Sequence, residues 1–450
     1  MTDTGQIFSN PGSVKNLWKW LSALLAVCVV ERLLLFVLYP PVSFSDTGAY
    51  RRLAETILNG WKNYDGTRTP GYPVFLAVVG SDKAVVATQM AMGIFITLII
   101  FYIGYKISHQ LMFAGLGALA HTLNLNQLFF ETNLITETLA TFWVMLSILG
   151  AFIWIKDKFK RTIWLGLVIG LSASLATLTR PLFIFLPFWL ALFLVLFADG
   201  FKIHFDWRPL ASTFILSAVI IGVWINYIHE NFYMWSVSSL SGFNTVQHTG
   251  YYFEYIPDKF ASLRDTYIQF RDERIAKYGT QGNAIWEAIP EMQRQSGYSF
   301  FEMSRLLSHL SMDLIREHPD LYLKYAFQGW WMFWLAPVYY VKANMPSEML
   351  GEAIRTSTYL ERALLIGCNA LFLISSVLTL FFKKLRAWWN LSAFWGLIAS
   401  TVWICSIVQT LLDHGDNPRF LIPLQSMVVF WALWILYQSI SRYHAGRQTK

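Results

Sequence analysis

Charged residues are scarce in this chain of 450 residues, and their scarcity excludes most soluble folds. Asp, Glu, Lys and Arg make up 14% of the sequence, against 55% hydrophobic and 17% aromatic residues. This composition is typical of polytopic membrane proteins. The net charge of +7 is then explained by basic residues kept in cytoplasmic loops, and it indicates no nucleic-acid partner.

Cysteine is also scarce. Cys28, Cys368 and Cys405 all fall within apolar segments and share no paired spacing. We therefore expect neither a disulfide framework nor a cysteine metal site. A cleavable signal peptide is not expected either, because the apolar run at 20–39 is too long for one and no small-residue cleavage site follows it.

Apolar runs long enough to cross a bilayer, roughly 20 residues each, recur along the chain and predict an all-α polytopic fold. We expect about 10–11 transmembrane helices, with an amphipathic first outer loop and a small helical outer domain. A run at 321–341 is ambiguous. The ten clearer runs lie near 20–39, 84–106, 110–130, 132–155, 162–180, 181–198, 210–229, 361–382, 389–412 and 419–440.

Basic loops set the predicted orientation. The positive-inside rule places in the cytoplasm the loops at 156–161, 202–208, 383–386 and 442–450. The loop 41–83 and the segment 230–320, which holds 12 acidic against 8 basic residues, then lie outside. If 321–341 crossed, the basic loop at 383–386 would move outside, so we favour an interfacial or re-entrant segment there.

Three modules follow from this map. They are an N-terminal transmembrane module at 1–229, an outer loop domain with the interfacial segment at 230–341, and a C-terminal transmembrane module at 342–450. Within the outer loop, leucines at helical spacing predict a helix over 304–315.

The first outer loop contains the most informative stretch, 44–80. Asp46 precedes an amphipathic run in which Tyr50, Leu53, Ala54, Ile57 and Leu58 share one helical face. The pattern predicts a helix over 47–59 that lies on the outer membrane surface and stops at Gly60. Asp46 is either its N-cap or a catalytic carboxylate, and the two roles are compatible.

Four more charged residues fall at the predicted outer face. Arg68 precedes a Pro-Gly-Tyr-Pro turn, Glu137 begins an apolar run, and Arg180 and Arg419 adjoin prolines. Each has a structural alternative: a headgroup contact or a snorkelling side chain for the arginines, a partnered carboxylate for Glu137. Their convergence with Asp46 suits a general base and a phosphate leaving group.

Two other acids and one arginine receive a structural interpretation, and a third acid is a further candidate for the site. Glu31 and Arg32 lie within the first predicted span and indicate a buried pair that holds helices together. Glu131 is interpreted as a solvated helix start. Asp65, in the first outer loop, is a candidate second acid.

These motifs together resemble the GT-C membrane glycosyltransferases, most closely the protein-mannosyltransferase and aminoarabinose-transferase branch called family 39. The resemblance covers roughly residues 15–190 and 410–440. The motifs that carry it, in chain order, are SDTGAYRRLAETILNG, RTPGYPVFLA, ITETLATFW, LATLTRP and NPRFLIPL.

The resemblance implies a polyprenyl-phosphate sugar donor, a glycan, lipid or protein acceptor, and inverting transfer on the non-cytoplasmic side. It places the base on Asp46. The candidates for binding the lipid phosphate or the substrate are Arg68, Arg180 and Arg419, together with Tyr50 and Tyr72. Many members carry an acidic pair in the first outer loop, but Asp46 is followed by Thr47, so a second acid would be Glu137 or Asp65. No cofactor is indicated, and a bridging divalent metal stays open.

The implied location is a bacterial inner membrane, with the site facing the periplasm or exterior. Two rival functions remain. A secondary transporter would need paired, broken spans in two halves, which the sequence lacks. A polysaccharide polymerase or ligase of the membrane would also use outer arginines but would not need Asp46.

Overall fold

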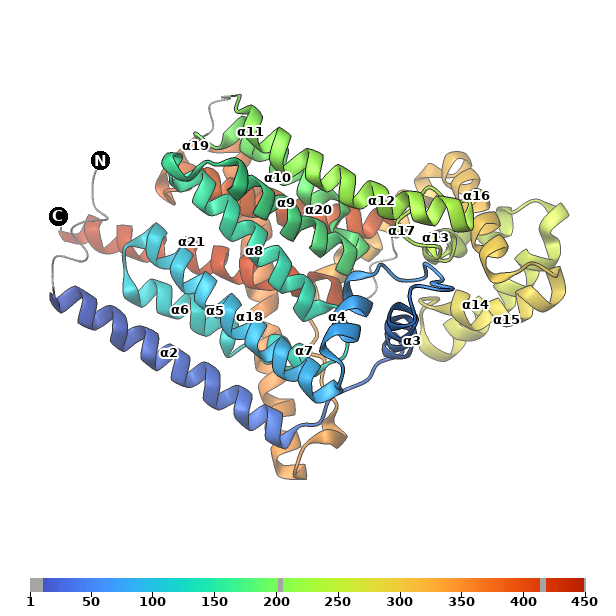
Figure 1. Cartoon of the computed structure of the whole chain (residues 1–450), viewed down its shortest axis with the longest axis horizontal. Coiled ribbons are helices and arrows are strands. Elements are labelled where there is room, and N and C mark those ends of the chain that lie inside the picture. The colour runs from blue at the N-terminus through green and yellow to red at the C-terminus, as the bar shows by residue number, and fades with distance from the viewer. Residues whose placement is uncertain (1–10, 201–204, 413–417, 449–450) are drawn as a thin grey trace.

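The computed structural model describes residues 11–200, 205–412 and 418–448, and in these ranges the protein is all-α. Most helices form one bundle, and Figure 1 shows that the beginning of α2 and the end of α21 lie at one end of it. The bundle helices are α2 (Pro11–Leu38), α5 (Asp82–Ser108), α6 (Leu111–Thr122), α7 (Leu125–Thr132), α8 (Glu137–Lys156), α9 (Ile163–Thr179), α10 (Leu186–Phe197), α11 (Trp207–Pro209), α12 (Ile215–Phe232), α17 (Pro319–Phe333), α18 (Glu348–Phe381), α19 (Lys383–Trp388), α20 (Ala393–Leu412) and α21 (Ile422–Gln448).

Seven helical stretches among the described residues are long and apolar enough to cross a membrane, so the chain has the character of a multi-pass membrane protein. Three shorter apolar helical stretches accompany them, at Leu111–Thr122, Ile163–Thr179 and Pro181–Phe197. The seven long stretches are Lys15–Leu38, Asp82–Ser108, Glu137–Lys156, Trp207–Phe232, Glu348–Phe381, Ala393–Leu412 and Arg419–His444.

The predicted span at 110–130 is wrong as a single helix. The chain breaks between α6 and α7, where the Asn124 side chain caps α7 by accepting a hydrogen bond from the Gln127 amide. The 12 residues of α6 extend only ~18 Å, short of the ~30 Å hydrocarbon core. The break turns α7 and the segment after it toward the site described below.

The ambiguous run at 321–341 also does not form one long helix. The helix α17 stops at Phe333, and the backbone of 334–341 is irregular. Within this segment the side chains of Trp334 and Ala336 are buried. Irregular backbone in a membrane protein is tolerated where it is packed against protein. Here it packs beside α2 and α7, because the Val341 amide donates to the Tyr39 hydroxyl and the Tyr339 amide donates to the Asn126 side chain.

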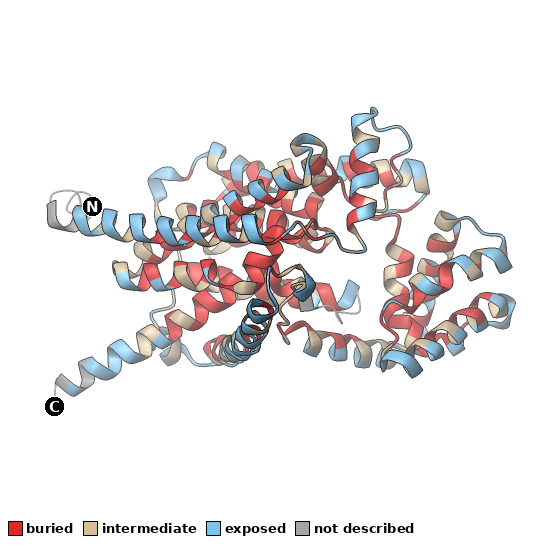
Figure 2. Ribbon diagram, turned by 90° about the horizontal axis from the view of Figure 1, so that it is seen from below, coloured by how far each residue is buried: buried red, intermediate tan, exposed pale blue. Residues whose placement is uncertain are grey.

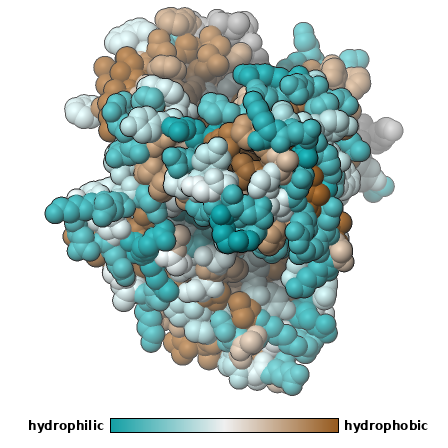
Figure 3. Space-filling view, turned by 90° about the vertical axis from the view of Figure 1, so that its right-hand side faces the viewer, coloured by the Kyte–Doolittle hydropathy of each residue, from teal (hydrophilic) through white to brown (hydrophobic). Residues whose placement is uncertain are grey.

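The predicted outer loop domain forms a separate helical unit at one end of the molecule (Figure 1). Its own apolar core runs from Leu240 to Leu314, and the helix predicted over 304–315 is confirmed as part of α16. Hydrophilic side chains cover much of this end (Figure 3). Its helices are α13 (Ser241–Thr249), α14 (Ala261–Tyr278), α15 (Ala284–Ser296) and α16 (Phe300–Glu317).

This outer unit is docked onto the first outer loop. The Ser239 amide donates to the Gly66 carbonyl at 3.0 Å, and the Ser239 hydroxyl donates to the Asp65 carbonyl at 3.0 Å. Ser238 adds a bond to the Thr67 carbonyl. The unit therefore covers the turn that leads into Arg68.

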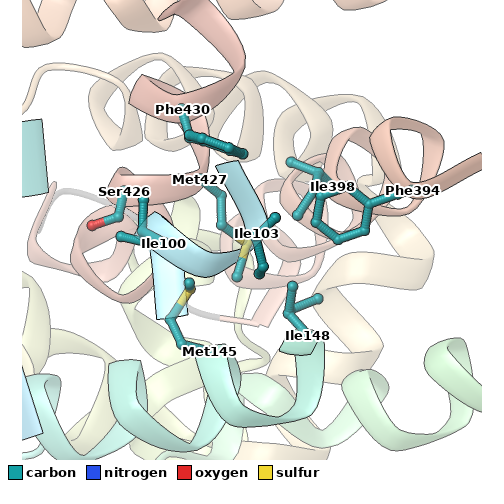
Figure 4. A pocket seen from close by; sticks show the side chains of 9 residues that line it. All are labelled: Ile100, Ile103, Met145, Ile148, Phe394, Ile398, Ser426, Met427 and Phe430. Atoms are coloured by element: carbon teal, nitrogen blue, oxygen red, sulfur yellow. The ribbon is translucent and has the colours of Figure 1, made fainter. Parts of the chain in front are cut away.

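Burial differs strongly between the first and last long helices. In the apolar window of Lys15–Leu38 17% of residues are buried, against 78% in that of Arg419–His444, and Figure 2 shows the mostly exposed first helix. The core contains a void of about 10 Å³ with apolar walls (Figure 4). That volume holds a water molecule at most, so this void is no ligand site.

Candidate functional site

Asp46 is held between two arginines from distant parts of the chain. Arg68 Nη2 lies 2.8 Å from Oδ1 of Asp46, and Arg419 Nη2 lies 3.0 Å from Oδ2. The three side chains are 22%, 24% and 23% exposed, for Asp46, Arg68 and Arg419 respectively. Each carboxylate oxygen thus has its own guanidinium, and all three groups remain reachable from outside.

Glu137 is a buried member of the same network. Its Oε1 lies 2.6 Å from Arg180 Nη1 and 3.6 Å from Arg419 Nε. The Glu137 side chain is only 1% exposed and Arg180 is also buried. Arg419 therefore links the two carboxylates. We call these five residues the outer cluster: Asp46, Arg68, Glu137, Arg180 and Arg419.

Backbone pairing holds the segment that carries Asp46. The Val42 amide donates to the Thr132 carbonyl at 3.0 Å, and the Leu134 amide donates back to the Val42 carbonyl at 2.9 Å. The Thr47 hydroxyl donates to the Leu134 carbonyl at 3.0 Å. This short bridge fixes the chain from Val42 to Thr47 against the segment that leads to Glu137.

The N-cap interpretation of Asp46 is wrong in detail. Asp46 precedes α3 (Thr47–Leu58), but its backbone is helical and its side chain accepts no capping hydrogen bond. Its carboxylate bonds the two arginines instead. The helix itself and its stop are confirmed, since Gly60 has a positive φ of 79° and Trp61 donates back to the Thr56 carbonyl.

Most of the apolar face of α3 contacts protein, and the location of this helix at the membrane surface stays a prediction. Tyr50, Leu53 and Ala54 are buried, whereas Leu58 is exposed. Leu53 packs with residues at the outer end of α12. Tyr50 packs edge-on against Tyr72 with ring centroids 5.1 Å apart, and helix α4 (Gly71–Val79) carries that tyrosine.

Local sequence explains how three members of the outer cluster are presented. Glu137 begins α8, where a carboxylate is favoured by the helix N-terminus. Arg180 has extended backbone (φ −147°, ψ 110°) because Pro181 follows it and disfavours a helical conformation. Arg419 lies in a single 3₁₀ turn at Pro418–Leu421. The Phe420 ring lies between the arginines, 4.8 Å from the Arg180 guanidinium carbon and 5.8 Å from that of Arg419.

Aromatic residues line the cluster, and sequence reasoning found only some of them. Tyr50 lies 5.8 Å from the Arg68 guanidinium. Tyr72 is fully buried and its hydroxyl donates a hydrogen bond to Gln89, so it supports the cluster from the interior of the protein. Tyr339 was missed, although it lies close enough to Arg419 for their charges to interact, and burial raises its pKa to about 12. Its only signal was the aromatic run before 341.

The remaining acids proposed from the sequence lie elsewhere. Asp65 pairs with Arg52 at 2.7 Å and accepts bonds from Thr67 inside its own loop. Glu131 is buried, which contradicts the solvated helix start. Arg32 binds it with two hydrogen bonds, of 2.8 and 2.7 Å.

Glu31 completes this second group. The Arg32 guanidinium lies 2.6 Å from Glu31 and donates to Thr122 at 2.8 Å, so the predicted buried pair is confirmed and is larger than expected. We call this group the inner cluster: Glu31, Arg32, Thr122 and Glu131.

The electrostatics of the outer cluster favour an ionised Asp46. Burial raises the pKa of this carboxyl, but Arg68 and Arg419 lower it more, and the net pKa lies below the ordinary value of 3.8. Asp46 is therefore a carboxylate at neutral pH. While both guanidiniums hold it, it is also a weak base.

No group of three or more His, Cys, Asp or Glu side chains that could hold a metal ion is found in the described ranges. The outer cluster itself fits a metal poorly, because both oxygens of Asp46 already face guanidiniums. Lys202 and Asn417, from the predicted basic loop and the last motif, lie outside the described residues.

Comparison with known proteins adds no assignment. No family model matches the chain, and neither a curated protein sequence nor a solved structure matches it.

Proposed function

We propose that the protein is a membrane glycosyltransferase of the GT-C type. It moves a sugar from a polyprenyl-phosphate donor to an acceptor hydroxyl on the non-cytoplasmic side, with inversion. Asp46 is the general base. The order of the sequence motifs supports this assignment, and so does the composition of the outer cluster.

One observation carries the proposal: three arginines share two carboxylates at a reachable site. Arg68, Arg180 and Arg419 bring three positive charges against two negative ones, which leaves a net charge of +1. Guanidiniums match phosphate oxygens with paired hydrogen bonds. A site that served only to hold helices together would have no need of surplus positive charge or of exposed side chains.

The charges of this reaction balance against those of the site. A sugar joined to a polyprenyl phosphate is a phosphodiester with one negative charge, which the net +1 offsets. The acceptor oxygen attacks the anomeric carbon, the bond from that carbon to the phosphate oxygen breaks, and the acceptor proton moves to Asp46. The leaving phosphate then carries two negative charges, and protonation of Asp46 raises the protein charge to +2.

The resting contacts of Asp46 explain how the base becomes active. Arg68 and Arg419 each bind one of its oxygens. A donor phosphate competes for the same guanidiniums, and the pKa of Asp46 rises when they turn to the phosphate. The base is then strongest only when a donor is bound, which limits wasteful reaction with water.

The proposed topology follows the basic loops. Ten crossings are made by the seven long apolar stretches, by the two shorter ones at Ile163–Thr179 and Pro181–Phe197, and by α6 and α7 together, with α17 and 334–341 at the outer interface. A reporter fused after Gly282 should then report a non-cytoplasmic position, and one fused after Arg386 a cytoplasmic one. The opposite result at either position rejects this map.

The decisive experiment measures sugar transfer from synthetic polyprenyl-phosphate sugars by the purified protein and by two matched variants. Asp46→Asn removes the base, and we expect transfer to fall by about 10²–10⁴-fold with little change in thermal stability. Asp65→Asn is the control, because Asp65 also pairs with an arginine in the same loop and is 23% exposed. It should retain near-normal transfer.

Three results would reject the proposal. Full transfer by Asp46→Asn would show that Asp46 is not the general base. Absence of any transfer, together with passage of a labelled solute across vesicles that contain the protein, would favour a transporter. Joining of preassembled oligosaccharides that does not depend on Asp46 would favour a polymerase or ligase.

A further inference from the structure

A single glutamine in the bundle binds two segments that lead to the outer cluster. Gln89 lies on α5 and is completely buried. Its Nε2 donates to the carbonyls of Glu131 and Asn133, both at 2.9 Å. Its Oε1 accepts a hydrogen bond of 3.2 Å from the Tyr72 hydroxyl. Both amide hydrogens and the amide oxygen are therefore used.

Each of these contacts leads directly to a site residue. The segment 131–134 pairs with Val42 and Thr47, which flank Asp46, and it continues into Glu137. Tyr72 follows Arg68 across one turn and packs against Tyr50. The backbone of 131–133 has no helical partners for these carbonyls because α7 ends at Thr132. Gln89 supplies the missing donors.

Only a side chain with two donors and one acceptor at this length can make all three bonds. Glutamate has no N–H donor, and asparagine is one methylene shorter. The next turn of α5 extends the attachment, because Gly93 lies against the Glu131 carboxylate and a Cβ there would collide with Oε1. Two successive turns of α5 thus hold residue 131 by its carbonyl and by its side chain.

We propose that Gln89 is a positioning residue that sets the segment bearing Asp46 relative to the segment bearing Glu137. It touches neither the outer cluster nor a substrate in this structure, and it acts through the backbone of 131–134. The kinetic part of this inference rests on the proposed glycosyl transfer, whereas the structural part does not.

The test compares two variants of buried glutamines, Gln89→Met and Gln425→Met. Gln425 is also buried, but it donates to Asn369 between α18 and α21. Hydrogen–deuterium exchange is followed at the amides of Val42 and Leu134, which bond across the two segments. In Gln89→Met we expect at least tenfold faster exchange at these two amides while the remainder of α5 stays protected. Gln425→Met should leave them unchanged.

Transfer kinetics supply the second measurement. A misplaced base lowers kcat by about 10- to 100-fold, whereas KM for the donor should change less than threefold because all three arginines remain. Tyr72→Phe removes one of the three bonds and should reduce kcat by less than Gln89→Met. It also guards against a Gln89→Met variant that fails to fold.

The outcomes separate this inference from the proposed function. Unchanged exchange at Val42 and Leu134 in Gln89→Met overturns it, and so does faster exchange with normal kcat. A wild-type protein that transfers no sugar overturns the proposed function, and the exchange data then still decide whether Gln89 holds the two segments.

Discussion

The outer and inner clusters are built from the same types of charged side chain, but they differ in burial and in the ratio of arginines to carboxylates. In the inner cluster one arginine serves two carboxylates, and Arg32 and Glu131 are almost completely buried. In the outer cluster three arginines serve two carboxylates, and three of the five side chains are about one quarter exposed. The inner cluster joins α2 to α7 and α6, whereas the outer cluster lies where helices begin and end.

The comparison shows that residue type alone does not separate a structural group from a binding site. Arg32 makes two hydrogen bonds to Glu131 and further contacts to Glu31 and Thr122, so little of it remains for a ligand. The Arg68 and Arg419 side chains are each about one quarter exposed. Excess positive charge and access, rather than the presence of ion pairs, are the reasons for proposing an anion site at the outer cluster.

The largest effect is expected from breaking the inner cluster. Arg32→Met leaves Glu31 and Glu131 without their cation inside the bundle, and loss of one partner of a buried pair destabilises by about 3–5 kcal/mol. Thermal unfolding of the purified protein measures this loss. Arg52→Met is the control, since Arg52 forms an exposed pair with Asp65 that contributes only about 0–1 kcal/mol.

A second variant sharpens this contrast. Replacing Arg32 and Glu131 together by methionine and leucine should restore much of the stability lost in Arg32→Met, because removal of both charges ends the penalty of burying one. Wild-type stability in Arg32→Met itself would show that the inner cluster does not hold helices together.

Breaking the outer cluster should affect the reaction rather than the fold. In Arg68→Lys and Arg419→Lys we expect kcat/KM for the donor to fall by about 10²–10³-fold, because lysine lacks the planar fork. The unfolding temperature should change little, since these side chains are partly exposed. Arg52→Lys is the matched control, and a variant that keeps normal donor dependence removes its residue from the site.

The smallest effect is a shift with pH. Burial raises the pKa of Asp46 and the two arginines lower it more, so Arg419→Met should move the pKa upward. The acid limb of kcat/KM should therefore lie at higher pH in Arg419→Met than in the wild type. An unshifted limb would indicate that a group other than Asp46 controls it.

The free energy of unfolding should also depend on the protonation of Asp46. Because folding lowers the pKa of Asp46, its contribution is complete above the ordinary value of 3.8 and is lost as pH falls through the lower folded value. The stability difference between wild type and Arg419→Met should therefore be constant at neutral pH and shrink as pH falls through this range, which acid unfolding curves of the two proteins measure.

Several features could be predicted from local pattern. Long apolar runs identified the seven long helices, helical spacing identified α3 and part of α16, and Gly60 identified the end of α3. These succeed because hydrophobic length and turn chemistry are properties of neighbouring residues. The span at 110–130 failed because polar residues interrupt the apolar run at 121–127, where Asn124 caps a new helix.

The sequence by itself determined the membrane character of the chain and the charged residues available at one of its faces. Only the tertiary structure decided which of them meet. Asp46 and Arg419 are 373 positions apart, and no local pattern encodes a 3.0 Å contact over that separation. Glu131 and Glu137 are six positions apart, yet the turn after α7 directs one to the inner cluster and the other to the outer one. Packing of helix ends, not residue identity, made that choice.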